Sequence, residues 1–197
     1  MLMADMLVDK ETAGLATALD ALANGRPVIV TGAEGGAVLV MDGAKVTPDW
    51  INFMVTEARG LVGIAITARR AAELGLSLQP RRGRTDGPLY TQSIEARDGI
   101  ETGISAVDRT RTILAAVNGD AGDIVTPGHI FPQIPSGDEL GQSDLALRLV
   151  RKADGAKAAA ICTILDAQGQ AIGVSDAMGL ADRHGLALVR ADLVAQL

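Results

Sequence analysis

Four short apolar runs constrain the fold of this chain more than any other feature of its sequence. They lie at residues 27–31, 37–41, 61–67 and 158–165. Each run is too short to form an independent helix, and runs of this kind predict strands that are buried in a sheet. The glycine-rich segment Gly32–Gly36 separates the first two runs, and it therefore predicts the turn of a tight β-hairpin.

The segments between these runs carry helix signals. Thr47 and Pro48 predict the start of a helix, because threonine caps a helix and proline is tolerated at its first position. We expect this helix to end at Gly60, with an inner face made of Ile51, Met54 and Val55. Ser105 and Asp108 have the spacing of a capping box and predict a helix over residues 105–118. Further helices are expected at residues 10–24, 68–74, 143–154, 175–184 and 192–197, and further strands at 90–95 and 186–189.

Residues 120–142 contain three prolines, and we expect them to form a long irregular segment, which in a compact domain is usually functional or disordered. Elsewhere helices and strands are mixed along the chain. This order predicts one α+β domain over residues 1–197, in which helices cover a mixed sheet. Residues 1–10 are expected to form a loose N-terminal extension.

Charge and composition exclude several classes of function. The net charge is −6 and aromatic residues make up 2% of the chain, so we expect no nucleic-acid surface. A single cysteine excludes an intrachain disulfide framework. No apolar run approaches the roughly 20 residues of a membrane helix, and the N-terminus lacks the basic start of a signal peptide. We expect a cytoplasmic protein without membrane contact. Its mean hydropathy of +0.23 suggests apolar surface buried against a second copy.

His129 is the first candidate for acid–base chemistry. It lies in the segment Pro127–Pro132, whose prolines restrict the backbone, and an imidazole held in this way can take or give a proton. The alternative is a histidine that bonds only to the backbone of its loop. His184 precedes Gly185 at an expected helix end and is interpreted as favouring the negative end of that helix. Cys162 lies in an apolar run and is interpreted as inert packing.

Two segments are candidates for anion binding, and each also has a simpler interpretation. Arg81, Arg82 and Arg84 lie in a polar loop, where they would bind phosphate or remain solvated. Thr102 and Gly103 precede the expected helix at Ser105 and offer N–H groups and a hydroxyl. The glycine-rich turn matches neither a dinucleotide fingerprint nor a P-loop, and no spacing of histidine, cysteine and carboxylates supports a metal site.

Two motifs taken together resemble those of the 3,4-dihydroxy-2-butanone 4-phosphate synthase family. The first is Thr102-Gly103-Ile104-Ser105-Ala106-Val107-Asp108-Arg109, and the second is Pro127-Gly128-His129-Ile130-Phe131-Pro132. Residues 18–30, 90–96 and 185–193 also stand in register with family segments. The resemblance therefore covers nearly the whole chain after the first ten or so residues.

The resemblance implies a three-layer α/β/α domain and a homodimer with active sites between its subunits. It also implies a magnesium-dependent lyase that converts ribulose 5-phosphate into formate and dihydroxybutanone phosphate for riboflavin synthesis. Of the family's site, we expect His129 and Thr102 to be the catalytic candidates. The candidates for ligand binding are Thr91, Ser105 and Glu34.

The chain departs from the family at the positions that serve metal and phosphate. The family's acidic loop is replaced by Thr31–Ala37, which is shorter and keeps one carboxylate, Glu34. Four functional residues of the family are replaced in this chain. Glu139 stands in register with the phosphate-binding Arg, and Gln142 with the metal-ligating His. Gly63 stands in register with the active-site Cys, and Thr163 with the catalytic Glu. Because magnesium prefers several hard oxygen ligands, we expect no metal and no cofactor here.

Three interpretations remain open. The chain is a working synthase with rearranged residues, a non-catalytic member that binds a small molecule or pairs with an active relative, or an enzyme with metal-independent chemistry around His129 and Thr102. The missing acidic loop separates the first interpretation from the other two. In each case the expected ligand is a small anionic or sugar-phosphate-like molecule.

Overall fold

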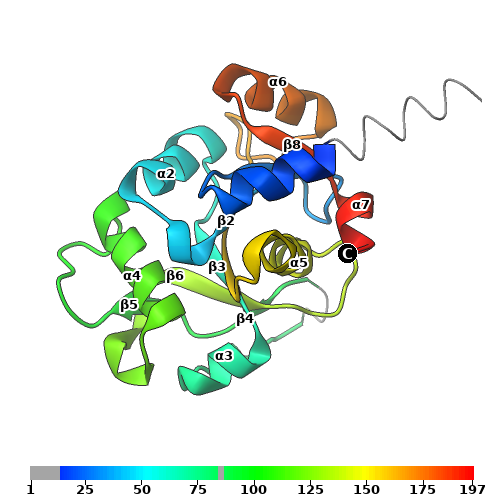
Figure 1. Ribbon diagram of the computed structural model, residues 1–197. Helices are drawn as coiled ribbons and strands as arrows, with labels where there is room; N and C mark the ends of the chain where they lie inside the picture. Colours follow the sequence, from blue (N-terminus) through cyan, green and yellow to red (C-terminus); the bar gives the residue numbers. More distant parts are fainter. Residues whose placement is uncertain (1–13, 84–86) are drawn as a thin grey trace, which may run out of the picture.

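A mixed sheet of eight strands forms the centre of the computed structural model, which describes residues 14–83 and 87–197. The strand order is β4-β6-β3-β7-β2-β1-β8, with β5 paired to β6 (Figure 1). The strands are β1 (Val28–Thr31), β2 (Val38–Asp42), β3 (Gly63–Ile66), β4 (Leu89–Tyr90), β5 (Ile94–Ala96), β6 (Ile124–Ile134), β7 (Ala158–Thr163) and β8 (Ala187–Arg190).

The helices occupy the positions expected from the sequence. They are a helix over residues 14–23, α2 (Pro48–Phe53) with the π-helical turn η2 (Met54–Ala58), α3 (Ala68–Glu73), α4 (Ala106–Asn118), α5 (Gln142–Asp154), α6 (Val174–His184) and α7 (Ala191–Ala195), with short turns η1 (Gly43–Lys45) and η3 (Ala121–Asp123). The start of the helix expected at 10–24 and the extension expected at 1–10 lie outside the described residues. In the part of the chain that is described, no helix is both long and apolar enough to cross a membrane.

Side chains alternate between the two faces of the sheet, as the twofold period of a strand requires. On one face, Ile29 and Leu39 belong to a buried cluster with residues of α2, α4 and α6. On the other face, Val28 and Val30 pack in a second cluster with α5, α7 and the helix over residues 14–23. In Figure 1, α2 and α4 lie at one side of the sheet and α5 and α7 at the other. Helices therefore cover both faces, which confirms the three-layer α/β/α prediction.

Local signals placed the hairpin and the helix starts correctly. β1 and β2 pair antiparallel with Val28 opposite Val40, on either side of the expected turn. The Thr47 side chain accepts a hydrogen bond from the Trp50 N–H, and the Ser105 side chain accepts one from the Asp108 N–H. Each of these side chains satisfies a backbone donor that the first turn of a helix leaves without a partner.

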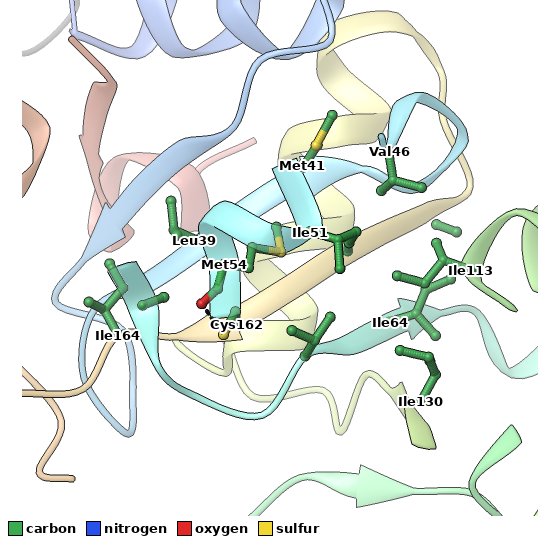
Figure 2. Close-up of a cluster of buried hydrophobic side chains, with 14 of the residues drawn as sticks. Leu39, Met41, Val46, Ile51, Met54, Ile64, Ile113, Ile130, Cys162 and Ile164 are labelled. Carbon is green, nitrogen blue, oxygen red and sulfur yellow. Dashed lines mark hydrogen bonds between the residues drawn. The ribbon is translucent and has the colours of Figure 1, made fainter. Parts of the chain in front are cut away.

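The larger buried cluster encloses the single cysteine (Figure 2). Cys162 is 1% exposed, and its thiol donates a weak hydrogen bond to the Met54 carbonyl at 3.8 Å. Burial raises the pKa of the Cys162 thiol to about 12. A thiolate is the reactive form of cysteine, so this pKa supports the interpretation of Cys162 as inert packing.

We expect Cys162 to react with iodoacetamide at pH 8 at least about a hundredfold more slowly in the native protein than in urea-unfolded protein. Burial and the raised pKa of the thiol both slow this reaction. Mass spectrometry gives an unambiguous readout, because the chain has one cysteine. Native labelling as fast as that of the unfolded chain would contradict the buried placement of Cys162.

The prediction of an irregular segment over residues 120–142 is wrong for its central part, because Ile124–Ile134 form the 11-residue strand β6. Val125 pairs with Glu95 and Ile130 pairs with Ile94, so the four residues between them bulge out of this ladder. Pro127 lies in that bulge, where strand pairing does not need the backbone N–H that proline lacks. Pro132 lies in the regular part, and its carbonyl accepts the N–H of Thr91 at 3.0 Å. His129 is therefore held on a bulged strand and not on a loop.

Three smaller predictions are also corrected. Val55 is 38% exposed, because the backbone switches to the π-helical turn η2 and rotates this side chain off the inner face. Leu61 is 55% exposed, because β3 begins only at Gly63. The strand expected over residues 90–95 is two short strands, β4 and β5, that pair with different parts of β6.

Candidate functional site

A histidine–carboxylate pair lies where β5 and β6 run side by side. His129 Nδ1 is 3.0 Å from Oε1 of Glu95. The Glu95 side chain is 16% exposed and the His129 side chain is 50% exposed. A carboxylate at this distance orients the imidazole and holds the proton on Nδ1, which leaves Nε2 as the proton acceptor. The pair therefore has the geometry of an oriented general base.

Gly103 packs directly against this pair. Its φ of +75° lies in the left-handed region, and a Cβ at this position would overlap Glu95 Oε1 and lie 2.5 Å from His129 Nδ1. Only glycine permits this approach. The fold therefore brings the Thr102-Gly103 segment of the first motif against His129 of the second.

Asp108 holds that segment in place from the first turn of α4. Its carboxylate accepts the N–H groups of Thr102 at 3.1 Å and Gly103 at 3.0 Å. These two donors, which the sequence suggested for an anion, are thus engaged within the chain. Desolvation raises the pKa of Asp108, but the hydrogen bonds from Gly103, Ser105 and Thr102 outweigh it, and the pKa is lowered overall. The Ser105 hydroxyl is engaged as the helix cap.

The lowered pKa of Asp108 predicts a stability that depends on pH. A carboxyl group with a lowered folded-state pKa stabilises the fold above the unfolded value of 3.8, and this contribution is lost as pH falls through the folded-state pKa. We expect the melting temperature of the wild type to fall more steeply below pH 4 than that of Asp108→Asn. Calorimetry from pH 7 to pH 3 measures this difference. Parallel curves for both proteins would show that Asp108 does not supply the dependence.

A separate cavity of about 750 Å³ lies at the N-terminal end of α5. The residues that line it include Glu34, Arg81, Gln142 and Thr163. Gln142 joins two parts of its wall, because its Oε1 accepts the Thr163 hydroxyl at 2.8 Å and its Nε2 donates to the Gly36 carbonyl at 3.3 Å. Further polar groups that line the cavity come from Tyr90, Gln133, Ser136, Asp138 and Ser143.

Within one chain, the candidate residues fall into two groups. His129 pairs with Glu95, and Thr102 and Ser105 flank Gly103, which packs against this pair, whereas Glu34 lines the cavity near Gln142. Neither His129 nor Thr102 is among the described residues that line that cavity. Thr91 is fully buried, and its hydroxyl donates to the Gln92 carbonyl.

Of the remaining described candidates, Arg81 belongs to the cavity group, whereas Arg82 and His184 lie apart from both groups. Arg81 lines the cavity and donates to the Gly87 carbonyl at 2.7 Å, Arg82 is exposed, and Arg84 lies outside the described residues. His184 lies 3.2 Å from a Glu57 carboxylate oxygen and stacks edge-on against Phe53. It therefore joins α6 to the end of α2.

Comparison with known proteins finds a family match over nearly the whole chain. A family model for 3,4-dihydroxy-2-butanone 4-phosphate synthase matches residues 16–196. The chain belongs to the 3,4-dihydroxy-2-butanone 4-phosphate synthase family. The synthase of Cupriavidus pinatubonensis is 36% identical over 92% of this chain and 86% of its own length. The synthase of Pseudomonas aeruginosa is 40% identical over 82% of this chain and 46% of its own length.

Solved structures of 3,4-dihydroxy-2-butanone 4-phosphate synthase share the fold. A two-domain synthase from A. baumannii superposes with a TM-score of 0.83 at 33% identity, over 90% of this chain and 55% of that one. A synthase solved in complex with two magnesium ions superposes with a TM-score of 0.82 at 25% identity, over 89% and 91% of the two chains. These matches confirm the resemblance in fold and family that the two motifs predicted.

The donor set of this synthase-family chain fits magnesium poorly. The described residues contain no group of three or more histidine, cysteine, aspartate or glutamate side chains that could hold a metal ion. In the cavity, the Gln142 oxygen already accepts from Thr163, and Asp138 Oδ1 accepts the Leu140 N–H at 3.0 Å. Magnesium requires a near-octahedral set of oxygens, commonly one or two carboxylates with waters and substrate phosphate.

Sequence reasoning missed two residues that complete the His129 group. Glu95 orients the imidazole, and Asp108 fixes the turn that carries Gly103. A signal for Glu95 was present, because it stands at an acidic position of the family strand that resembles residues 90–96. A strand position alone does not show which residue of another strand lies opposite, so the pair became evident only in the fold.

Proposed function

We propose that this chain is a divergent family member that binds a small sugar-phosphate-like ligand in the 750 Å³ cavity and does not carry out the metal-dependent lyase reaction. The observation that carries the proposal is the Gln142 side chain, whose oxygen and nitrogen are both engaged by neutral groups of the cavity wall. This amide stands in register with the metal-ligating His of the family. It fastens α5 to β7 and to the turn after β1.

The lining of the cavity favours a hydroxylated ligand. Hydroxyls and amides from Tyr90, Gln133, Ser143 and Thr163 can pair with sugar hydroxyls in either direction. Arg81 is the one cation among the described lining residues and can face a phosphate group. The family reaction needs a divalent ion to polarise a carbonyl–hydroxyl pair and carboxylates to move protons. With one carboxylate left from the acidic loop, Glu34, these requirements are not met.

We propose that the protein is cytoplasmic, and that it is a homodimer, as the family resemblance implies. A second copy offers a way to bring a His129 group to the cavity, because the two groups lie apart in one chain. Exposed Ile104 and Val107, next to Thr102, are apolar surface that such a contact would cover. Light scattering at micromolar concentration tests this part, and a species of 20.3 kDa alone would contradict it.

Genetic complementation tests the loss of the lyase reaction. We expect that this chain, expressed in a bacterial strain that lacks the synthase, does not restore growth without riboflavin. The synthase of Cupriavidus pinatubonensis, expressed in the same way, serves as the positive control. Restored growth would show that the lyase reaction is retained, and the first part of the proposal would be wrong.

Calorimetry tests the binding function separately. We expect ribulose 5-phosphate to bind in the presence of EDTA, and Arg81→Ala to weaken binding by about tenfold through loss of a charged contact. Arg82→Ala is the matched control, since Arg82 does not line the cavity. Absence of binding at millimolar ligand would refute the binding part.

The His129–Glu95 pair favours a second candidate function, which is metal-independent acid–base chemistry. The 3.0 Å contact from Nδ1 to the carboxylate orients the imidazole so that Nε2 can face a hydroxylated substrate as proton acceptor. If a turnover of any sugar phosphate is found, His129→Ala should abolish it and Glu95→Gln should reduce it by about a hundredfold. Unchanged turnover with lowered stability would make His129 a structural residue.

A further inference from the structure

We propose a second ligand site in this protein, a cavity that binds the anionic end of a phosphorylated small molecule. The cavity is about 790 Å³ in volume and lies between α3, α5 and the start of β7. None of its lining residues belongs to the cavity near Gln142 or to the His129 group. The inference therefore does not rest on the function proposed above.

The first observation is a concentration of positive charge in an acidic protein. The chain carries a net charge of −6, yet this cavity is lined by five cations and two carboxylates. The cations are Arg69, Arg70, Arg148, Arg151 and Lys157. A concave surface with an excess of one sign of charge attracts small ions of the opposite sign.

The second observation is that both carboxylates are already committed. Asp144 is 7% exposed and accepts the N–H groups of Ser136 at 3.1 Å and Gly137 at 3.0 Å. Glu73 pairs with Arg69 at 2.9 Å and with Arg70 at 3.4 Å. The carboxylates therefore stabilise a turn and a short helix, and the other three cations of the cavity have no acidic partner in the part of the chain that the structure describes.

The third observation concerns those three cations. Arg148 and Arg151 are one turn apart on α5 and so lie on the same helix face. Arg148 donates to the Ala195 carbonyl at 2.8 Å, which anchors its guanidinium. Arg151 and Lys157 make no side-chain hydrogen bond or ion pair with the residues that the structure describes. Guanidinium groups present donors that match phosphate oxygens in pairs.

The place of the cavity in the sheet also favours a ligand site. Thr67 directly follows β3 and Pro135 directly follows β6, and these two strands are parallel neighbours. Crevices beyond the carboxyl ends of parallel strands are where open α/β sheets bind their ligands. Val117, Leu147 and Ala156 supply apolar wall beside the cations. An organic phosphate with an apolar part fits this combination better than a free inorganic anion.

Calorimetry with pyrophosphate and with ADP tests the proposal on the full chain. We expect both to bind at 50 mM salt, ADP more tightly because its base and ribose contact the apolar wall. Arg151→Glu and Lys157→Glu should each weaken ADP binding by about tenfold or more. Both side chains are exposed and have no side-chain partner among the described residues, so these variants should fold like the wild type.

Lys152→Glu is the matched control, because Lys152 is an exposed cation of α5 that does not line the cavity. We expect it to change the affinity by less than about twofold. Three outcomes would overturn the proposal: no binding of either probe at millimolar concentration, equal losses for Lys152→Glu and Arg151→Glu, or binding of a single-stranded oligonucleotide but of neither probe. Failure of ribulose 5-phosphate to bind would not bear on it.

Discussion

Replacing Gly128 by alanine should lower the free energy of unfolding by about 3 kcal/mol or more. A Cβ at Gly128 would overlap the carbonyl group of Ile94 and lie 2.5 Å from the amide nitrogen of Glu95. All of these are backbone atoms, so no side chain can rotate away to make room. Relief requires β5 and β6 to separate at the bulge. Urea denaturation followed by circular dichroism measures the loss.

Gly179→Ala is the matched control for this prediction. Gly179 lies within α6, where an added Cβ would meet the Arg183 guanidinium at an ordinary distance of 3.5 Å. Alanine in a helix interior is favoured over glycine, so this variant should gain about 0.5–1 kcal/mol. A Gly128→Ala variant as stable as the wild type would show that β5 and β6 do not approach as closely as described. It would also weaken the case for the contact between His129 and Glu95.

Ile64→Ala should cost about 3–4 kcal/mol of unfolding free energy. Ile64 is fully buried within β3 and belongs to the cluster drawn in Figure 2. It pairs with Pro132 of β6 on one side and with Ala160 of β7 on the other. Neither neighbour can extend into the space that a shorter side chain leaves, because both belong to strands fixed by the sheet. The loss therefore combines lost burial with a cavity that remains open.

Leu78→Ala tests whether that loss is specific to the core. Leu78 is 50% exposed, and its replacement should change the unfolding free energy by less than about 1 kcal/mol. The denaturant slope should stay the same in both variants, which would show that the midpoint shift reports stability. If the two variants lost equal stability, the placement of Ile64 at the centre of the sheet would be wrong.

Much of the fold was predictable because its signals are local. The apolar runs around Val28 and Val38, with a glycine-rich turn between them, specify a hairpin without reference to distant residues. Thr47 and Ser105 are caps whose hydrogen bonds reach only three residues along the chain. The two motifs also identified the family.

β6 was not predictable from its own residues. Two prolines and a glycine argue against a strand, and the segment becomes one only because β3, β4 and β5 supply partners from elsewhere in the chain. The bulge opposite Ile94 then removes the need for a donor at Pro127. Strand pairing between segments far apart in sequence has no local signature. The proline content therefore predicted an irregular segment where the structure has a strand.

The sequence by itself determined a mixed sheet covered by helices, the helix caps and, through the family resemblance, the layered α/β/α arrangement and most of the candidate residues. Only the tertiary structure decided which of them meet. It set Glu95 against His129, placed Gly103 where a side chain would not fit, and separated both from Gln142 and Glu34. The physical reason is that helix caps and apolar periodicity act over a few residues, whereas a site depends on side chains that long-range strand pairing brings together.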